Sequence, residues 1–263
     1  MKLNYREVNP GSPRKLLILH GLLGSSQNWV RVAPRLAENT HVLIPDLRNH
    51  GASPHASHSL QWMYEDILEF LNDHDIKQTF LLGHSLGGLA AMRFAFQNPE
   101  RLDGLIVEDI SPASRLNRMD TIFHALTGLD LSKIRTRQEA DEHLSQKIPH
   151  REIRQFLLQN LKRKESGAFF WRCNLKELER FTKTNEFRLT DSDRFDGPSL
   201  FIGGMNSEQT IDGHTKILSR HFPNYVLVMI PDAGHWVHFD AMPRFAEIVT
   251  DFLKNRFRML HRE

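Results

Sequence analysis

The sequence predicts an α/β fold in which a mostly parallel sheet is covered by helices on both faces. Short apolar runs alternate with longer amphipathic segments along the first half of the chain, as in folds that repeat a strand and a helix. The runs are almost free of polar residues, which is typical of strands buried on both faces. Each run ends in a polar or glycine-rich turn. Because ligands bind at the carboxyl ends of parallel strands, we expect a functional site at that edge.

The first half of the chain supplies the strands and helices of this repeat. Strands are expected at residues 16–19, 42–44, 80–82 and 105–107. Helices are expected at residues 28–38, 60–73 and 87–97. Asn98-Pro99 ends the last of these helices, because proline cannot continue a helix interior.

The alternation breaks between residues 112 and 194. Helical spacing recurs there, as in Leu175, Leu178 and Phe181, without a convincing strand. This stretch carries 17 Lys and Arg against 12 Asp and Glu and is therefore the basic part of the chain. Strands at 199–202 and 225–230 and a helix at 243–256 follow it. We expect a core of residues 1–111 and 195–263 and a helical insertion at 112–194.

Composition excludes several classes of protein. The 263 residues are 40% hydrophobic and 25% charged, which indicates an ordinary globular unit. A net charge of +2 gives no reason to expect a nucleic-acid partner. Cys173 is the only cysteine, so no intramolecular disulfide or four-thiolate metal site can form. The charged N-terminus and the lack of an apolar run of about 20 residues predict a cytoplasmic protein without a membrane span.

Ser85 is the candidate nucleophile. It lies in Gly83-His84-Ser85-Leu86-Gly87, directly after the strand at 80–82 and before a helical segment. A serine on such a sharp turn adopts strained dihedral angles, and the two glycines let neighbouring backbone pack closely. An inert glycine-rich turn is the alternative, but the strand before it and the helix after it favour a nucleophile.

A serine hydroxyl needs a base and an acid that orients the base. His235, in Gly234-His235-Trp236, follows the last strand and is expected at the same sheet edge as Ser85. His84 and His238 are the alternatives for the base. A metal site at His235 and His238 is not expected, because the chain lacks a His-Glu-x-x-His pattern.

The acid could come from either of two strand ends. The loop after the strand at 199–202 contains Asn206 and Glu208 but no aspartate. Glu108 and Asp109 follow the strand at 105–107, and alternation along a strand points their side chains to opposite sides. We select Asp109 as the acid and keep Glu208 as the alternative.

Backbone amides are candidates for an oxyanion hole. His20-Gly21-Leu22-Leu23-Gly24 follows the first apolar run, and such a turn can direct the Leu22 N–H toward the site beside the Leu86 N–H. Neither a P-loop nor a dinucleotide-binding glycine pattern occurs, so no nucleotide site is expected.

Three other segments have weaker assignments. The polar stretch 46–53, which includes Arg48 and His50, is interpreted as structural. Trp236 is a candidate wall of an apolar substrate pocket. The basic run 162–164 is either a solvated helix end or a binding site for the phosphate of a coenzyme A thioester.

These motifs resemble the α/β-hydrolase superfamily along nearly the whole chain. Within it the sequence is most similar to YbfF-type bacterial esterases, through Asp46-Leu47-Arg48-Asn49-His50-Gly51-Ala52-Ser53 and Asp109-Ile110-Ser111-Pro112. The resemblance implies Ser85, His235 and Asp109 as the triad, and a helical cap after the sixth strand. It also implies a small-molecule acyl ester or thioester as substrate.

The sequence thus predicts a serine hydrolase that needs no cofactor and no metal. A carbon–carbon bond hydrolase or lyase with the same triad is the nearest enzymatic alternative, and a non-catalytic binding protein is the alternative from another class. The sequence indicates no oligomeric state.

Overall fold

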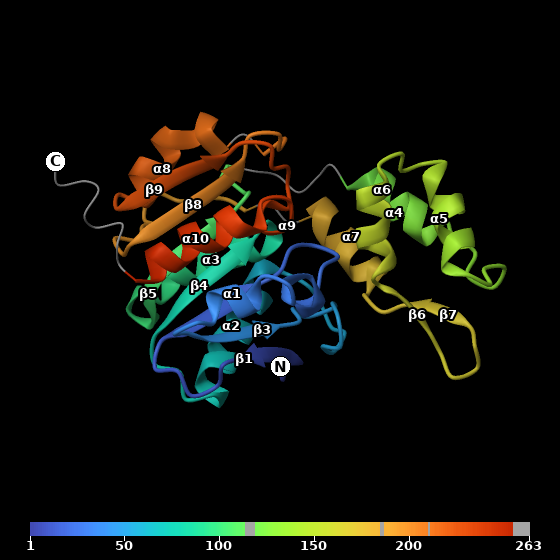
Figure 1. Ribbon diagram of the computed structural model, residues 1–263, viewed down its shortest axis with the longest axis horizontal. Helices are drawn as coiled ribbons and strands as arrows, with labels where there is room; N and C mark the ends of the chain where they lie inside the picture. The colour runs from blue at the N-terminus through green and yellow to red at the C-terminus, as the bar shows by residue number, and fades with distance from the viewer. Residues whose placement is uncertain (114–118, 185–186, 210, 255–263) are drawn as a thin grey trace.

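The computed structural model describes residues 1–113, 119–184, 187–209 and 211–254 (Figure 1). Within these ranges a seven-stranded sheet has the order β1-β3-β2-β4-β5-β8-β9, and every neighbouring pair except β1 and β3 is parallel. Its strands are β1 Tyr5–Val8, β2 Lys15–Leu19, β3 His41–Pro45, β4 Thr79–His84, β5 Leu102–Glu108, β8 Ser199–Gly204 and β9 Tyr225–Ile230. The predicted α/β fold class is confirmed.

Helices connect the strands of the sheet. The α-helices are α1 Ala33–Leu36, α2 Leu60–Asp73, α3 Leu86–Gln97, α4 Asp120–Thr127, α5 Arg137–Ser145, α6 Arg151–Leu158, α7 Leu175–Thr184, α8 Thr215–His221, α9 Val237–Asp240 and α10 Met242–Leu253. Short 3₁₀ helices are η1 Ser26–Trp29, η2 Pro99–Arg101 and η3 Ile211–His214. Nowhere in the described ranges is a helix both long enough and apolar enough to cross a bilayer.

Strand alternation divides the core between the two faces of the sheet. Leu17, Leu81 and Leu105 pack into the cluster that contains α2, α3 and α8. Ile18 and Ile106, which point the other way, pack against η1, α1 and α10. Because successive side chains of a strand point to opposite faces, fully apolar strands bury both faces at once.

The N-terminal part of the core differs from the prediction in two places. The edge strand β1 has mostly exposed side chains, so its sequence lacks the apolar signal by which the other strands are recognised. The helix expected at 28–38 is broken into η1 and α1, and Pro34 lies in the first turn of α1. Proline is tolerated there but not inside a longer helix, because it lacks an amide donor.

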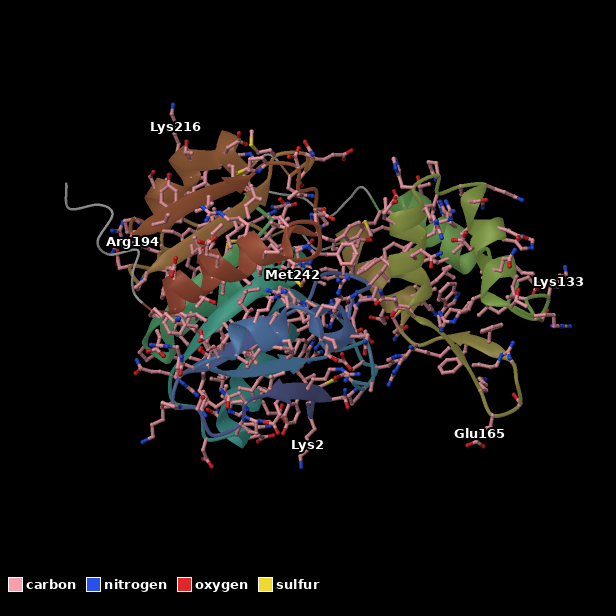
Figure 2. All side chains as sticks on the ribbon, viewed as in Figure 1. Lys2, Lys133, Glu165, Arg194, Lys216 and Met242 are labelled. Carbon is pink, nitrogen blue, oxygen red and sulfur yellow. The ribbon has the colours of Figure 1, made fainter. Side chains whose placement is uncertain are left out.

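The segment between β5 and β8 contains four helices within its described residues, but the expectation that it lacks strands is wrong. β6 Leu161–Arg163 pairs antiparallel with β7 Phe169–Trp171. Strands of three residues are too short to show a two-residue period, and Gly167, with a φ of 85°, forms the turn between them. Figure 2 shows Glu165 at the tip of this hairpin, pointing away from the core.

Two further expectations change in detail. The insertion follows the fifth strand of the described chain, where the sixth was expected, because only one edge strand, β1, precedes the parallel strands. Residues 114–118 and 185–186 of the expected insertion, and 255–256 of the expected last helix, lie outside the described residues.

Close backbone packing joins β4 to α3. A Cβ atom added at Gly83 would lie 2.2 Å from the carbonyl oxygen of Gly87, and neither backbone can move without displacing a buried element. A Cβ atom at Gly213 would meet no heavy atom within 4 Å. The two glycines therefore offer a matched test of this packing.

We predict that Gly83→Ala lowers the free energy of unfolding by about 2 kcal/mol or more, as expected for an overpacked core. Gly213→Ala should leave it within about 0.5 kcal/mol of the wild-type value, since surface changes usually do. Urea unfolding followed by circular dichroism measures both. Equal stability of the two variants would contradict the packing described here.

Candidate active site

Ser85 lies on a sharp turn between β4 and α3. Its φ of 52° and ψ of −116° lie outside the usual regions for a residue with a side chain. Its N–H donates to the carbonyl of Glu108 at 3.0 Å, and its own carbonyl accepts from Leu89 N–H at 3.1 Å. The strained backbone is thus held by the neighbouring strand on one side and by the first turn of the helix on the other.

The glycines around Ser85 bring the end of β2 against this turn. A Cβ atom at Gly87 would lie 2.3 Å from the carbonyl oxygen of Leu19. A Cβ atom at Gly21 would lie 2.7 Å from Nδ1 of His84 and 3.3 Å from Cβ of Ser85. Only glycine allows this approach, so the loop that contains Leu22 lies beside the serine.

His235 and Asp109 meet at the same edge of the sheet. His235 Nδ1 donates to Asp109 Oδ2 at 2.7 Å, with 32% of the histidine side chain and 1% of the aspartate side chain exposed. A hydrogen bond at Nδ1 fixes the tautomer and leaves Nε2 able to accept a proton. The ring of His84, the neighbour of Ser85, lies 4.8 Å from the ring of His235. Among the described residues, no hydrogen bond joins Ser85 Oγ to His235.

Asp109 is held by the loop after β8. It accepts hydrogen bonds from the Gly204 N–H at 3.0 Å and from the Ser207 hydroxyl at 2.5 Å, in addition to the one from His235. Asp109 has a φ of 48°, and its side chain contacts His235 whereas that of Glu108 contacts His238. In this loop the sequence pointed to Glu208 as the alternative acid, and it gave no signal for Ser207, whose role has no motif.

The alternative candidates have other partners. His84 Nε2 donates to the carbonyl of His235 at 2.9 Å, and burial lowers the pKa of His84 to about 3. Glu208 is exposed, and the hydrogen bond of His235 goes to Asp109. Burial raises the pKa of the Cys173 thiol to about 12, so this side chain is not a competing nucleophile.

Glu108 binds the other alternative, His238. The Glu108 carboxylate is fully buried and accepts from the His238 N–H at 2.8 Å and from His238 Nδ1 at 2.7 Å. Burial raises the pKa of Glu108 to about 7 and lowers that of His238 to about 3. The N and O atoms of His84, Glu108 and His238 lie within 4.8 Å of one another, which is the composition of a metal site. The N–H groups of both histidines are engaged in hydrogen bonds, and we assign these residues no ligand role.

The Leu22 loop is held from two directions. Leu23 has a φ of 60°, and its N–H donates to His50 Nε2 at 3.1 Å. Its carbonyl accepts from Asn160 Nδ2, which comes from the insertion, at 2.7 Å. The Leu86 N–H lies at the first position of α3, where an amide has no acceptor within the helix.

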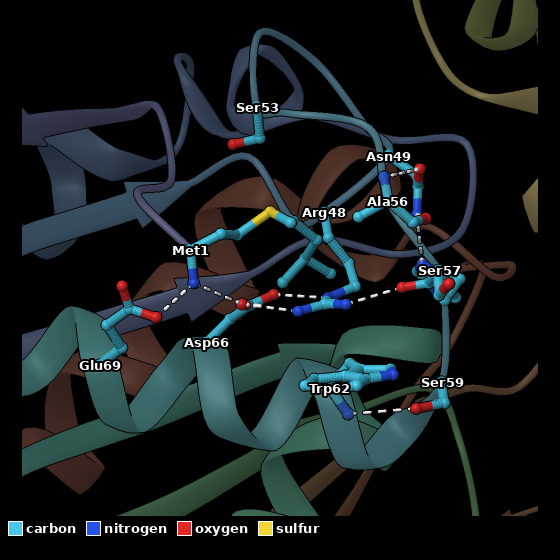
Figure 3. Close-up of polar contacts among 12 residues, drawn as sticks. Met1, Arg48, Asn49, Ser53, Ala56, Ser57, Ser59, Trp62, Asp66 and Glu69 are labelled. Carbon is cyan, nitrogen blue, oxygen red and sulfur yellow. Dashed lines mark hydrogen bonds and ion pairs between the residues drawn. The ribbon is translucent and has the colours of Figure 1, made fainter.

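The polar stretch 46–53 is structural, as predicted. Asp46 accepts hydrogen bonds from Ser26 N–H and Ala52 N–H. The Arg48 guanidinium donates twice to the buried Asp66, at 2.6 and 2.7 Å, and also to the carbonyl of Ser57 (Figure 3). Arg48 is therefore committed to bracing α2 and is not free to bind a substrate anion.

The insertion contacts the site through an aromatic pair. The ring of Trp236 lies 5.0 Å from that of Phe156 on α6. The basic run 162–164 belongs to β6 and the turn after it, where the guanidinium of Arg163 lies 4.7 Å above the ring of Phe169. It is not a helix end.

The chain is similar in sequence and in fold to known hydrolases. A family model described as the alpha/beta hydrolase family matches residues 16–248. The chain is 35% identical over 259 residues to the sn-1-specific diacylglycerol lipase ABHD11 of Danio rerio, covering 93% of this chain and 80% of that protein. It is 31% identical to Esterase YbfF of Escherichia coli, covering 97% of this chain and 100% of that protein. A solved structure of a marine microorganism esterase superposes with a TM-score of 0.89 at 34% identity, covering 95% of this chain and 99% of that one.

Buried histidines make the stability of the site depend on pH. The pKa values of His58, His84 and His238 are lowered to about 3, chiefly by burial. An imidazole in the unfolded chain takes up a proton near pH 6.5, so each of these groups stabilises the fold above that pH and loses the contribution as the pH falls toward 3. Glu108 acts in the opposite direction, because its raised pKa lets the folded state bind a proton first. Because three histidines act in one direction and one glutamate in the other, the free energy of unfolding falls as the pH is lowered.

We predict that the free energy of unfolding falls as the pH is lowered from 7.5 to 5. His58→Gln should reduce this pH dependence, since one proton corresponds to about 1.4 kcal/mol per pH unit. Urea unfolding at several pH values gives the slope for both proteins. If the slopes coincide, His58 is not a neutral buried group.

Proposed function

The chain belongs to the alpha/beta hydrolase family, and from that premise we propose that it hydrolyses carboxylic esters by a Ser85–His235–Asp109 triad. The observation that carries the proposal is the 2.7 Å hydrogen bond between His235 and Asp109, at the sheet edge that also presents the strained Ser85. Relatives named esterase or lipase, and the solved structure of a similar esterase, support the reaction class.

In the proposed reaction, Ser85 Oγ attacks the acyl carbonyl while His235 Nε2 takes its proton. The ester C–O bond then breaks, and His235 returns the proton to the leaving alkoxide. A water molecule attacks the acyl-enzyme in the same way and releases the acid and the free serine. Asp109 holds the His235 ring in the required tautomer and favours its protonated form, with Gly204 N–H and the Ser207 hydroxyl fixing the carboxylate.

The amides of Leu22 and Leu86 stabilise the oxyanion in this mechanism. The Leu22 loop lies against Ser85 because of Gly21, and Leu86 begins the helix whose amide ends carry partial positive charge. A donor of this kind contributes about 3 kcal/mol to the transition state. Two hydrogen bonds keep the loop in place: the Leu23 N–H donates to His50, and Asn160 donates to the Leu23 carbonyl.

The insertion at residues 112–194 acts as a cap that shapes the substrate pocket. Phe156 of the insertion packs on Trp236, the residue next to the base, and we assign Trp236 to the wall of this pocket. Acyl thioesters are a second substrate class for the same chemistry, because a thioester carbonyl is attacked by the same nucleophile. The size of the pocket sets the preferred length of the acyl chain, which a series of esters with different chain lengths measures.

We predict that the wild type hydrolyses p-nitrophenyl esters of short acyl chains and that Ser85→Ala lowers kcat/KM by about 10³-fold or more. Ser219→Ala, a control that removes an exposed hydroxyl of α8, should retain wild-type activity. Assays from acetate to palmitate, run beside acyl-coenzyme A thioesters, give the acyl preference. A fluorophosphonate probe should label the wild type and the control but not Ser85→Ala, and absence of labelling in all three would favour a binding protein.

The identity of the acid is tested by two amide substitutions. Asp109→Asn should lower kcat by about 10²- to 10⁴-fold, because the amide supports the wrong tautomer of His235. Glu208→Gln should change kcat by less than about twofold, as for a surface residue outside the triad. Steady-state kinetics with one ester decides between them, and the reverse order of effects would assign the acid to Glu208.

A further inference from the structure

Glu108 is a buried carboxylate that the proposed mechanism does not use. It adjoins Asp109 at the end of β5, and its carbonyl accepts the N–H of Ser85. Its side chain accepts two hydrogen bonds from His238, one from the backbone and one from the ring. A single residue therefore touches the segment of the nucleophile and the segment of the base.

The contact with His238 fixes the segment that carries the base. His238 lies three residues after His235, on α9. Its ring stacks on that of Trp29, with the ring planes 13° apart and the centroids 4.2 Å apart. Both hydrogen-bonded groups of His238 are buried with Glu108, so a shift of this segment would leave a buried charge without donors. His84 holds the same segment from the other side through the carbonyl of His235.

Once it is ionised, above its raised pKa of about 7, Glu108 is a second negative charge near His235 beside Asp109. His84 faces it from β4, Asp109 follows it directly after β5, and His235 and His238 face it from the segment after β9. His238 also interacts with Asp240 on α9. Both histidines other than His235 have strongly lowered pKa values, so they stay neutral near pH 7 and do not cancel the charge that Glu108 carries when it is ionised.

We infer that Glu108 is a positioning residue of the site: through His238 it fixes the segment that carries His235, and its ionised form favours the protonated form of His235. This inference rests on the proposed function, in which His235 becomes protonated in each half of the reaction. A residue that only stabilised the fold would not change the protonation of His235. The imidazole titration of His235 therefore separates the two roles.

The test is an NMR titration of the His235 imidazole in wild type, Glu108→Gln, Glu108→Asp and Asp103→Asn. The resonance is assigned among the 15 histidines by its loss in His235→Gln. Asp103→Asn is the matched control, because it removes one carboxylate charge from an exposed position on the same strand. Thermal unfolding of each variant shows that it is folded, and ester kinetics give kcat and KM separately.

We expect Glu108→Gln to lower the titration midpoint of His235 by about 0.5 pH unit or more, because the removed charge favours the imidazolium. Its kcat should fall about tenfold with KM changed by less than about twofold, since the base acts in the transition state. Glu108→Asp keeps the carboxylate, so its His235 midpoint should lie close to the wild-type value. This variant also provides the test if Glu108→Gln does not fold. Asp103→Asn should change neither quantity.

A His235 midpoint that is unchanged in Glu108→Gln, or shifted equally in Asp103→Asn, would overturn the inference. An effect on KM alone would also overturn it. If the wild type hydrolyses no ester, the proposed function fails, and the NMR midpoints still decide whether Glu108 acts on His235.

Discussion

The end of β5 is the constraint on which the arrangement of the site depends. Two neighbouring residues there, Glu108 and Asp109, face different histidines of one segment, His238 and His235. The carbonyl of Glu108 also accepts the N–H of Ser85. A parallel sheet brings the ends of β4, β5 and β8 to one edge, so contacts between residues far apart in the chain become local.

The buried polar groups of this edge stay compatible with a low-dielectric interior because each has a specific partner. Asp109 accepts hydrogen bonds from a backbone amide, a hydroxyl and an imidazole. Glu108 accepts a hydrogen bond from His238, which is buried beside it and neutral near pH 7. An unpaired carboxylate at either position would cost several kcal/mol, so these partners determine the conformation of the loops as much as the apolar core does.

The insertion is connected to the site by few but well-placed contacts. Asn160 reaches the carbonyl of Leu23, and Phe156 packs against Trp236. Figure 1 shows its helices gathered to one side of the sheet. Changes in the insertion can therefore reach the Leu22 loop and Trp236 while the strands that hold Ser85 and Asp109 keep their register.

The sequence by itself determined six of the seven strands of the described sheet and several helices, and it named the candidate residues Ser85, Asp109 and His235. Apolar runs and helical periods depend only on local spacing, and the strand at 225–230 and the helix at 60–73 have the bounds that were predicted. The glycines around Ser85 likewise indicate, from a few residues of sequence, that neighbouring backbone segments pack closely there. Where local signals were weak, as for the exposed β1 and the three-residue strands β6 and β7, the prediction failed.

Only the tertiary structure decided which polar groups meet. The hydrogen bonds of Gly204 with Asp109, Glu108 with His238 and Asn160 with Leu23 join residues 95, 130 and 137 positions apart. Their geometry depends on how the strands, loops and insertion pack in three dimensions, and no spacing along the chain encodes it. That is why Ser207 and Asn160 carry no motif, and why the partner of each histidine could be assigned only from the folded chain.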